Sequence, residues 1–323
     1  MYVGTQLQPF TAPPNRTRRW AYLLLFGYTL NLLIEFMMLR FTKGTDGHWV
    51  VEMATKLENG MIFLILGAGA FSLICSVGFI ISFLRERRFH RERISRWSVT
   101  IDDFLHVMAW LQIFTTFMYA GYAFFLPNPI FPEGSIGGVL ESASFQLMIL
   151  VIAAFRFFGR WEVIGFTRPK SMTRMLLAIV GILAFIIVGL DFLLTTPIAD
   201  WLNLSLQSQR ETDIQNSIVQ AKTFNWMNGL VSIAVVGIMV PIAEEILFRG
   251  VIQTYLVKRF GAVIGVLLTS FWFALMHVDI ALFIPLFVIG LGLGFVRHRY
   301  NSIWGAIILH SLNNLASAMH YFN

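Results

Sequence analysis

Six polar residues interrupt the apolar sequence in the last third of the chain. They are Glu244, Glu245, Arg249, His277, His310 and Asn314. An isolated charge in an apolar segment is costly, so chains usually keep one only where another group pairs with it or a function uses it. A carboxylate in apolar surroundings suits a general base, which takes a proton and later returns it. These residue types therefore indicate proton-transfer chemistry.

Helical spacing separates the two adjacent carboxylates. Glu245 and Arg249 are four residues apart, so they share one helix face and can neutralise each other. Glu244 is turned by ~100° from Glu245 and needs another partner. His310 and Asn314 are also four apart and present two hydrogen-bonding groups in one direction. Glu244 is therefore the carboxylate left free for chemistry.

The helices that carry these residues must bring them to one depth in a membrane. We take Arg259 and Arg299 as markers of one membrane surface, with a rise of ~1.5 Å per residue. Glu244 then lies ~22 Å from Arg259, His277 ~27 Å from it, and His310 ~16 Å from Arg299. After tilt and turns are subtracted, these depths are compatible with one layer near the middle of a ~30 Å hydrocarbon core.

The composition is that of a membrane protein. The 323 residues are 57% hydrophobic and only 13% charged, whereas a soluble domain carries roughly 25% charged residues. The net charge is +6, but the basic residues form short clusters between apolar runs, as in cytoplasmic loops. We therefore expect no nucleic-acid partner. Cys75 is the only cysteine, which excludes an intrachain disulfide and a cysteine metal cluster.

About nine apolar stretches approach the ~20 residues needed to cross a bilayer. They are 20–39, 61–84, 104–126, 137–158, 175–195, 227–243, 261–277, 280–296 and 303–319. Each is expected to be helical, because backbone groups in hydrocarbon must be hydrogen-bonded within the segment. The predicted fold class is all-α, a polytopic transmembrane bundle of about eight or nine spanning helices, with the active site inside the C-terminal bundle.

Basic residues predict the orientation in the membrane. Five clusters follow alternate crossings or precede the first one. They are Arg16, Arg18 and Arg19; Arg85, Arg87, Arg88, Arg91, Arg93 and Arg96; Arg160, Arg168, Lys170 and Arg174; Lys258 and Arg259; and Arg297 and Arg299. The positive-inside rule then places the amino terminus in the cytoplasm and the carboxyl terminus outside. We expect a multi-pass protein of the cell membrane whose loop 197–224 lies outside, as an amphipathic segment on the surface.

Three motifs in the last third resemble those of a known family. EEILFR at 244–249, FALMH at 273–277 and HSLNN at 310–314 are similar to the motifs E-E-x-x-x-R, F-x-x-x-H and H-x-x-x-N/B. Those motifs belong to the CPBP family (Abi, or type II CAAX prenyl proteases) of intramembrane endopeptidases, which includes the Ras-converting enzyme. The order and spacing also fit. We therefore predict a CPBP/Abi-like catalytic transmembrane domain at 161–323, with its motif core at 225–323, and N-terminal transmembrane helices of unknown role at 1–160.

The resemblance implies a role for each of the six residues. Glu244 and His277 would activate a water for attack on the scissile amide, and His310 and Asn314 would hold the developing oxyanion. The remaining two, Glu245 and Arg249, would support them. Hydrogen-bond donors directed at an oxyanion in a water-poor cavity are effective, since removing one typically costs ~10² to 10³ in rate. The expected substrate is a membrane-associated or lipidated protein or peptide in the lipid bilayer.

Each motif alone also has a structural interpretation. The charged residues of the first motif could form only an ion pair, His277 could bond a nearby carbonyl, and His310 with Asn314 could join helices through hydrogen bonds. Their joint occurrence in order favours catalysis. The alternative is a non-catalytic membrane binding, immunity or scaffold protein, or a transporter, that uses the same polar layer. Other polar residues in the apolar stretches are interpreted as structural: Glu35, His106, Glu141, Arg156 and Asp191.

A zinc site is a second alternative for the same residues. Glu244, His277 and His310 would make a set of two histidines and one carboxylate, with water as the fourth ligand. The chain has no H-E-x-x-H helix, and the apolar stretches place no two of the three on one helix. The resemblance and the missing spacing favour a mechanism without a cofactor or metal.

Overall fold

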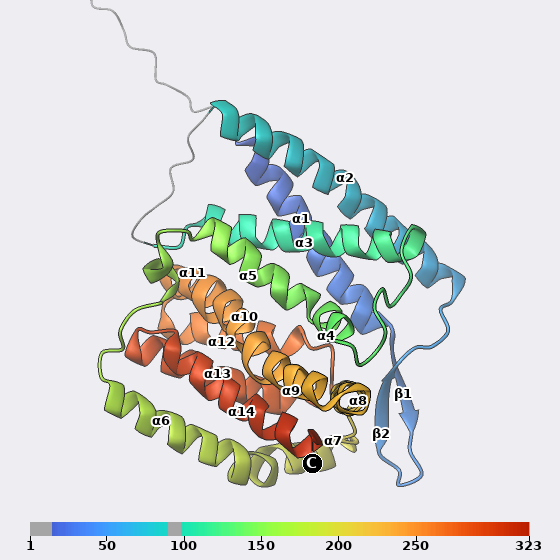
Figure 1. The fold of residues 1–323 in the computed structure, drawn as a ribbon, viewed down its shortest axis with the longest axis vertical. Helices are drawn as coiled ribbons and strands as arrows, with labels where there is room; N and C mark the ends of the chain where they lie inside the picture. Colours follow the sequence, from blue (N-terminus) through green and yellow to red (C-terminus); the bar gives the residue numbers. More distant parts are fainter. Residues whose placement is uncertain (1–14, 90–97, 323) are drawn as a thin grey trace, which may run out of the picture.

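The structure, a computed structural model, describes residues 15–89 and 98–322. Within these two ranges the chain is a layered assembly of helices with one β-hairpin (Figure 1). In that view α1 and α2 lie at the top, α6 lies at the bottom, and α9 to α14 lie between α5 and α6. Three of the basic residues used for the orientation, Arg91, Arg93 and Arg96, lie outside the described residues.

The first third of the chain contributes three long helices and the hairpin. The elements are α1 (Arg16–Met37), β1 (Leu39–Lys43), β2 (Trp49–Met53), α2 (Asn59–Phe89) and α3 (Ile101–Phe124). Helix α3 begins with a capping box, in which Thr100 and Asp103 exchange side-chain to backbone hydrogen bonds. The two strands pair antiparallel, with Leu39 opposite Met53.

The hairpin is the exception to the all-α prediction. Its turn contains Asp46 and Gly47, and Gly47 has a φ of 88°, a conformation that glycine adopts without a steric penalty. β-branched and aromatic residues in the flanking strands favour extended structure. The hairpin is docked on a distant segment, because Trp49 N donates to Asn203 O and Ser205 N donates to Trp49 O. The link between α1 and α2 therefore forms a small sheet that is hydrogen-bonded to residues 203–205.

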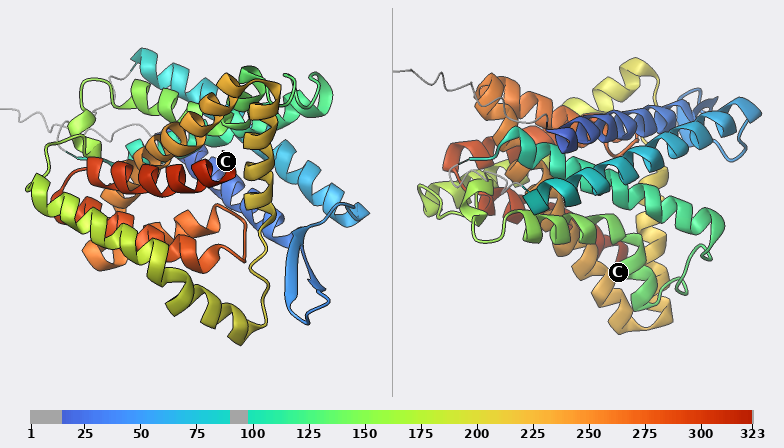
Figure 2. Two further views of the ribbon diagram at one scale, coloured as in Figure 1. Left: turned by 60° about the horizontal axis from the view of Figure 1, so that its bottom comes forward. Right: turned by 90° about the horizontal axis from the view of Figure 1, so that it is seen from above.

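The middle of the chain is built from short and bent helices. The elements are α4 (Ile136–Ser142), α5 (Ser144–Arg156), η1 (Trp161–Ile164), α6 (Met172–Ala184), η2 (Phe185–Gly189), η3 (Asp191–Thr195), α7 (Thr196–Leu202) and α8 (Gln209–Phe224). Helices α4 and α5 meet at a bend of 70°. In Figure 2 (left), α8 stands between the end of α14 and the hairpin, and residues from all three line one pocket.

The last third holds one long helix and three shorter ones. The long helix runs through α9 (Trp226–Ala234), η4 (Val235–Met239), α10 (Val240–Glu245), η5 (Ile246–Ile252) and α11 (Gln253–Phe260). It is followed by α12 (Ala262–Leu275), α13 (Phe283–Tyr300) and α14 (Trp304–Phe322). Gly261, with a φ of 84°, separates α11 from α12, and Asn301 ends α13 in the left-handed region.

The structure has fewer candidate membrane spans than the sequence predicts. In the described residues, four helices are long and apolar enough to cross a membrane, or five if the bent pair α4–α5 counts as one span. The count of eight or nine is therefore not confirmed. Helix α12 has only 14 residues, and α14 carries His310, Asn313 and Asn314 on a 19-residue helix. Residues 226–260 form the most buried candidate, with 50% of the tested window inside the protein.

An apolar core joins the first helices to the last ones. Phe104 of α3 stacks on Tyr255 of α11 with ring centroids 5.3 Å apart, and Phe248 meets Phe273 edge-to-face at 5.2 Å. Buried side chains of α1, α2, α3 and α5 belong to the same cluster as those of α10, η5 and α12. The helix that carries the two carboxylates is thus supported by apolar contacts on the side of α3 and α5.

Candidate active site

A π-helical segment positions the first motif. Glu244 and Glu245 are the last residues of α10, and Arg249 lies in η5, a seven-residue π-helix. Such segments are rare and often occur at functional sites, because the wider turn changes which side chains face one another. All three side chains are buried, Glu245 and Arg249 completely.

Glu245 is the centre of an ion and hydrogen-bond cluster. Its Oε1 accepts a hydrogen bond from Arg249 Nη1 at 3.0 Å, as the four-residue spacing predicts. The same oxygen lies 2.8 Å from His310 Nδ1. Arg249 also donates through Nη2 to the carbonyl of Gly290 at 3.2 Å, and its guanidinium carbon lies 4.5 Å from the centroid of the Phe273 ring. The cluster therefore joins α10, η5, α12, α13 and α14.

The contact with Glu245 orients the His310 ring. Because an ionised carboxylate only accepts hydrogen bonds, the 2.8 Å contact assigns a proton to Nδ1 of His310. The other nitrogen, Nε2, then lies 3.9 Å from Glu244 Oε2, which is beyond hydrogen-bond distance. Within the described residues, the Glu244 carboxylate forms no hydrogen bond, and it lines a pocket. Glu244 is thus free, as its position beside the Glu245–Arg249 pair predicts.

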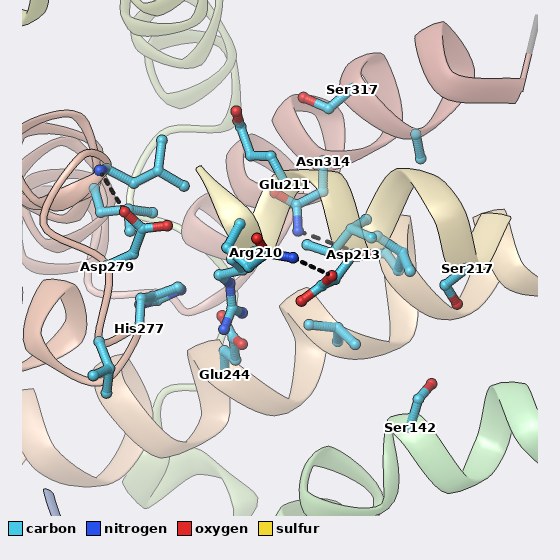
Figure 3. A pocket seen from close by; sticks show the side chains of 18 of the residues that line it. Ser142, Arg210, Glu211, Asp213, Ser217, Glu244, His277, Asp279, Asn314 and Ser317 are labelled. Carbon is cyan, nitrogen blue, oxygen red and sulfur yellow. Dashed lines mark hydrogen bonds between the residues drawn. The ribbon is translucent and has the colours of Figure 1, made fainter. Parts of the chain in front are cut away.

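His277 reaches the same pocket from the turn after α12. Its Nδ1 is 2.7 Å from the carbonyl oxygen of Phe273, one turn earlier, and its ring meets the Phe273 ring at a centroid distance of 4.9 Å. A carbonyl partner places the proton on Nδ1, so that Nε2 of the neutral ring carries a lone pair. Figure 3 shows His277 and Glu244 on facing walls of the pocket.

Asn314 is held by the long helix. Its Nδ2 donates to the carbonyl of Val236 in η4 at 3.3 Å, and it lies one turn beyond His310 on α14. Asn314 therefore faces the pocket with a fixed amide, of which one N–H is engaged by the backbone while the second N–H and the carbonyl oxygen are available.

The pocket collects four of the six predicted residues. Its volume is about 750 Å³, within the range of small-molecule and peptide pockets. Glu244, His277, His310 and Asn314 line it, whereas Glu245 and Arg249 lie behind it. Several lining residues were not predicted as part of a site. They are Arg210, Glu211 and Asp213 of α8, Asp279, and Leu39, Val51 and Met53 of the hairpin. No motif in the sequence identifies them.

The electrostatics of the pocket rim come from α8. Glu211 lies in its first turn, outside the candidate spans. Partial burial raises the pKa of Glu211 above its ordinary value, and the neighbouring charges of Asp279 and Asp191 raise it further. Repulsion among these like charges thus favours the neutral form of Glu211.

The zinc alternative can be compared with this geometry. Within residues 15–89 and 98–322, no three histidine, cysteine, aspartate or glutamate side chains are grouped so that they could hold a metal ion. The rings of His310 and His277 use Nδ1 to contact Glu245 and a backbone carbonyl, which leaves Nε2 of both rings for another partner. The arrangement as it stands does not assemble Glu244, His277 and His310 around a common point.

The sequence of this region matches a protein family. Residues 226–316 match the model of the family described as type II CAAX prenyl endopeptidase Rce1-like. This part of the chain is therefore similar to the domain of that family. The domain begins with α9, ends within α14 and contains all six residues described above. No curated protein and no solved structure matches the chain significantly.

Proposed function

We propose that the protein is an intramembrane endopeptidase that hydrolyses a peptide bond in a membrane-associated or lipidated protein or peptide. The observation that carries this proposal is the convergence of Glu244 and His277 on one pocket, with His310 fixed beside them by Glu245. The Rce1-like domain supports a protease of the CAAX type. A prenylated peptide with a C-terminal CAAX sequence is therefore the first substrate to test.

In the proposed reaction, water is held between Glu244 and His277. Glu244 takes a proton from the water, and the hydroxide attacks the carbonyl carbon of the scissile bond. The resulting oxyanion accepts a hydrogen bond from the second N–H of Asn314 and from the imidazolium form of His310, which donates through Nε2 and keeps both of its protons throughout. Glu245 orients that ring because its carboxylate accepts a hydrogen bond from Nδ1. Glu244 then returns the proton to the leaving amine, which completes hydrolysis of the C–N bond.

The proposal extends to the remaining predictions from the sequence. The amino terminus is cytoplasmic, 161–323 form the catalytic transmembrane domain, and 1–160 form an accessory membrane module. Lys258 and Arg259 end the long helix at the cytoplasmic side, whereas the pocket lies nearer the end that begins at Trp226. Substrates therefore reach the pocket from the side opposite the amino terminus. Labelling of single cysteines introduced into α7 and α11, in a Cys75→Ser background, tests this orientation in sealed vesicles.

The central test compares two intramembrane carboxylates. Purified protein in detergent is given a farnesylated CAAX peptide, and cleavage is followed for wild type, Glu244→Gln and Glu35→Gln. Loss of a general base should lower kcat by ~10² to 10⁴ in Glu244→Gln. Glu35 lies in α1 and does not line the pocket, so Glu35→Gln should cleave at the wild-type rate.

The other outcomes separate the alternatives. Equal cleavage by wild type and Glu244→Gln would reject Glu244 as the base. Cleavage that a chelator abolishes and zinc restores would replace the metal-free mechanism with a zinc mechanism. Peptide binding without cleavage, unchanged in Glu244→Gln, would favour the non-catalytic binding or scaffold alternative.

A further inference from the structure

Helix α8 is fixed to the loop that follows His277. Ser208 caps α8 by accepting a hydrogen bond from Glu211 N at 3.0 Å, and its hydroxyl donates to Asp279 Oδ2 at 2.6 Å. The other oxygen of Asp279 accepts from Leu282 N at 3.0 Å. One carboxylate thus joins the start of α8 to the turn between α12 and α13. Residues in the first turn of α8 are therefore held in a defined position relative to His277.

Arg210 lies in this first turn and is a cation without a partner. Its side chain is partly buried and lines the same pocket as Glu244 and His277, toward which Figure 3 shows it directed. The nearest candidate partner on its own helix is occupied, because Asp213 accepts a hydrogen bond from Gln209 at 3.0 Å. Within the described ranges 15–89 and 98–322, Arg210 forms no hydrogen bond or ion pair.

An unpaired guanidinium in a partly apolar pocket needs a counter-charge to offset its desolvation. The pocket lining also supplies four acidic groups, Glu211, Asp213, Asp279 and Glu244, but within the described residues none of them forms an ion pair with Arg210. Their negative charge disfavours an anion placed directly beside them. The distribution of charge in the pocket therefore directs an anionic group of a ligand to Arg210.

We propose that Arg210 binds the free C-terminal carboxylate of the substrate. This inference rests on the proposed endopeptidase function, in which the scissile bond of a CAAX substrate lies close to the end of the chain. Three extended residues span about 10 Å. The pocket volume of about 750 Å³ lies within the range of ligand pockets, so it has room for a tail of this length. Guanidinium groups bind carboxylates through two parallel hydrogen bonds, which makes Arg210 a specificity determinant.

The test uses two farnesylated peptides of one sequence, one ending in a free carboxylate and the other in a C-terminal amide. Wild type should cleave the acid with a kcat/KM about tenfold higher or more, the size expected for a charge-assisted pair. In Arg210→Gln this preference should disappear through a higher KM for the acid, while cleavage of the amide stays unchanged. Unchanged cleavage of the amide also shows that the variant is folded. Lys222→Gln removes a cation from the same helix outside the pocket and should keep the preference.

Two results would overturn the assignment. Wild type could cleave both peptides equally, or Arg210→Gln could slow both by the same factor, which would indicate a structural or directly catalytic role. Failure of the proposed function is distinguished by measuring binding of both peptides to Glu244→Gln protein. If wild type cleaves neither peptide but Glu244→Gln binds the acid more tightly than the amide, and Arg210→Gln abolishes that difference, the carboxylate site stands without the protease. Equal binding of acid and amide would reject the site.

Discussion

Two buried clusters of carboxylate and arginine lie in different parts of this protein. In the N-terminal half, Asp103 of α3 is completely buried, and its Oδ1 accepts hydrogen bonds from Arg156 Nε at 2.9 Å and from Arg160 Nη2. Its Oδ2 accepts from the backbone N and the hydroxyl of Thr100, both at 2.9 Å. In the C-terminal bundle, the carboxylate of Glu244 faces the pocket and comes no closer to His310 Nε2 than 3.9 Å.

The two clusters differ in how fully the carboxylate oxygens are hydrogen-bonded, which we call saturation. Asp103 uses both oxygens on four donors and is remote from the pocket lining, so it can join helices but cannot meet a reactant. Glu244 has capacity left over and a cavity in front of it. A buried charge alone therefore does not distinguish a structural group from a catalytic one. The two kinds of group are distinguished by whether the charge can form further hydrogen bonds and whether a ligand can reach it.

The largest effect expected from this comparison is a crossed result for two neutralising substitutions. Glu244→Gln should abolish most cleavage, with a loss of ~10² to 10⁴ in kcat, and leave the melting temperature nearly unchanged. Asp103→Asn should leave Arg156 and Arg160 without their shared carboxylate and lower the free energy of unfolding by ~3 to 5 kcal/mol. Folded Asp103→Asn protein should cleave at the wild-type rate. Thermal unfolding in detergent and steady-state cleavage measure the two effects.

An activity loss in folded Asp103→Asn protein, equal to that in Glu244→Gln, would break the distinction between the clusters. So would a melting temperature that falls as far in Glu244→Gln as in Asp103→Asn. Either result would mean that saturation does not separate structural from catalytic charges in this protein.

Glu245 combines features of Asp103 and Glu244. Its Oε1 accepts a hydrogen bond from Arg249, and the same oxygen orients His310 through Nδ1. Glu245→Gln should leave Arg249 uncompensated and cost ~3 to 5 kcal/mol of stability. It should also slow cleavage, because the Gln amide holds the Nδ1 side of His310 less firmly than the carboxylate does. The double variant Glu245→Gln/Arg249→Met should recover stability but not activity. Recovery of both would reduce Glu245 to a purely structural role.

Local spacing accounts for the parts of the site that the sequence predicts. The pair Glu245–Arg249 and the position of Asn314 one turn beyond His310 follow from helix periodicity. Periodicity cannot specify which helix faces meet, and the contact of Glu245 with His310 joins residues 65 positions apart. For the same reason, the sequence suggests a structural role for Arg156 but does not identify Asp103 as its partner.

Local sequence patterns likewise account for the helices of the fold but not for how they are arranged. The apolar stretches correspond to helices, but their number as membrane spans was not confirmed, because apolar composition does not fix helix length or bends. Helix α8 was expected to be an amphipathic segment at the surface, and its position over the pocket depends on the bond between Ser208 and Asp279. That bond, like the hairpin contact with Asn203, is a long-range event without a local pattern.

A smaller effect than those above is expected at Asn314. If its amide donates to the oxyanion, Asn314→Ala should lower kcat by ~10² to 10³ with little change in KM. Asn314 also donates to Val236, so the variant should lose only ~0.5 to 1.5 kcal/mol of stability. Neighbouring Asn313 lines the pocket as well and provides the matched control, since Asn313→Ala should keep kcat. A rise in KM for Asn314→Ala with an unchanged kcat would assign this residue to substrate binding instead.

The smallest effect concerns Glu211, which has like charges as neighbours in place of donors. Burial and the charges of Asp279 and Asp191 raise its pKa, so folding favours the neutral carboxyl. Wild-type stability should therefore fall as the pH rises through the raised pKa, whereas Glu211→Gln lacks this dependence. Because the side chain is largely exposed, the variant should gain no more than about 0.5 kcal/mol at neutral pH.

Melting temperatures of both proteins should converge as the pH is lowered below the ordinary range of a glutamate. A difference that persists at acid pH would assign the effect to packing, and a variant less stable at neutral pH would show that Glu211 has a favourable partner after all.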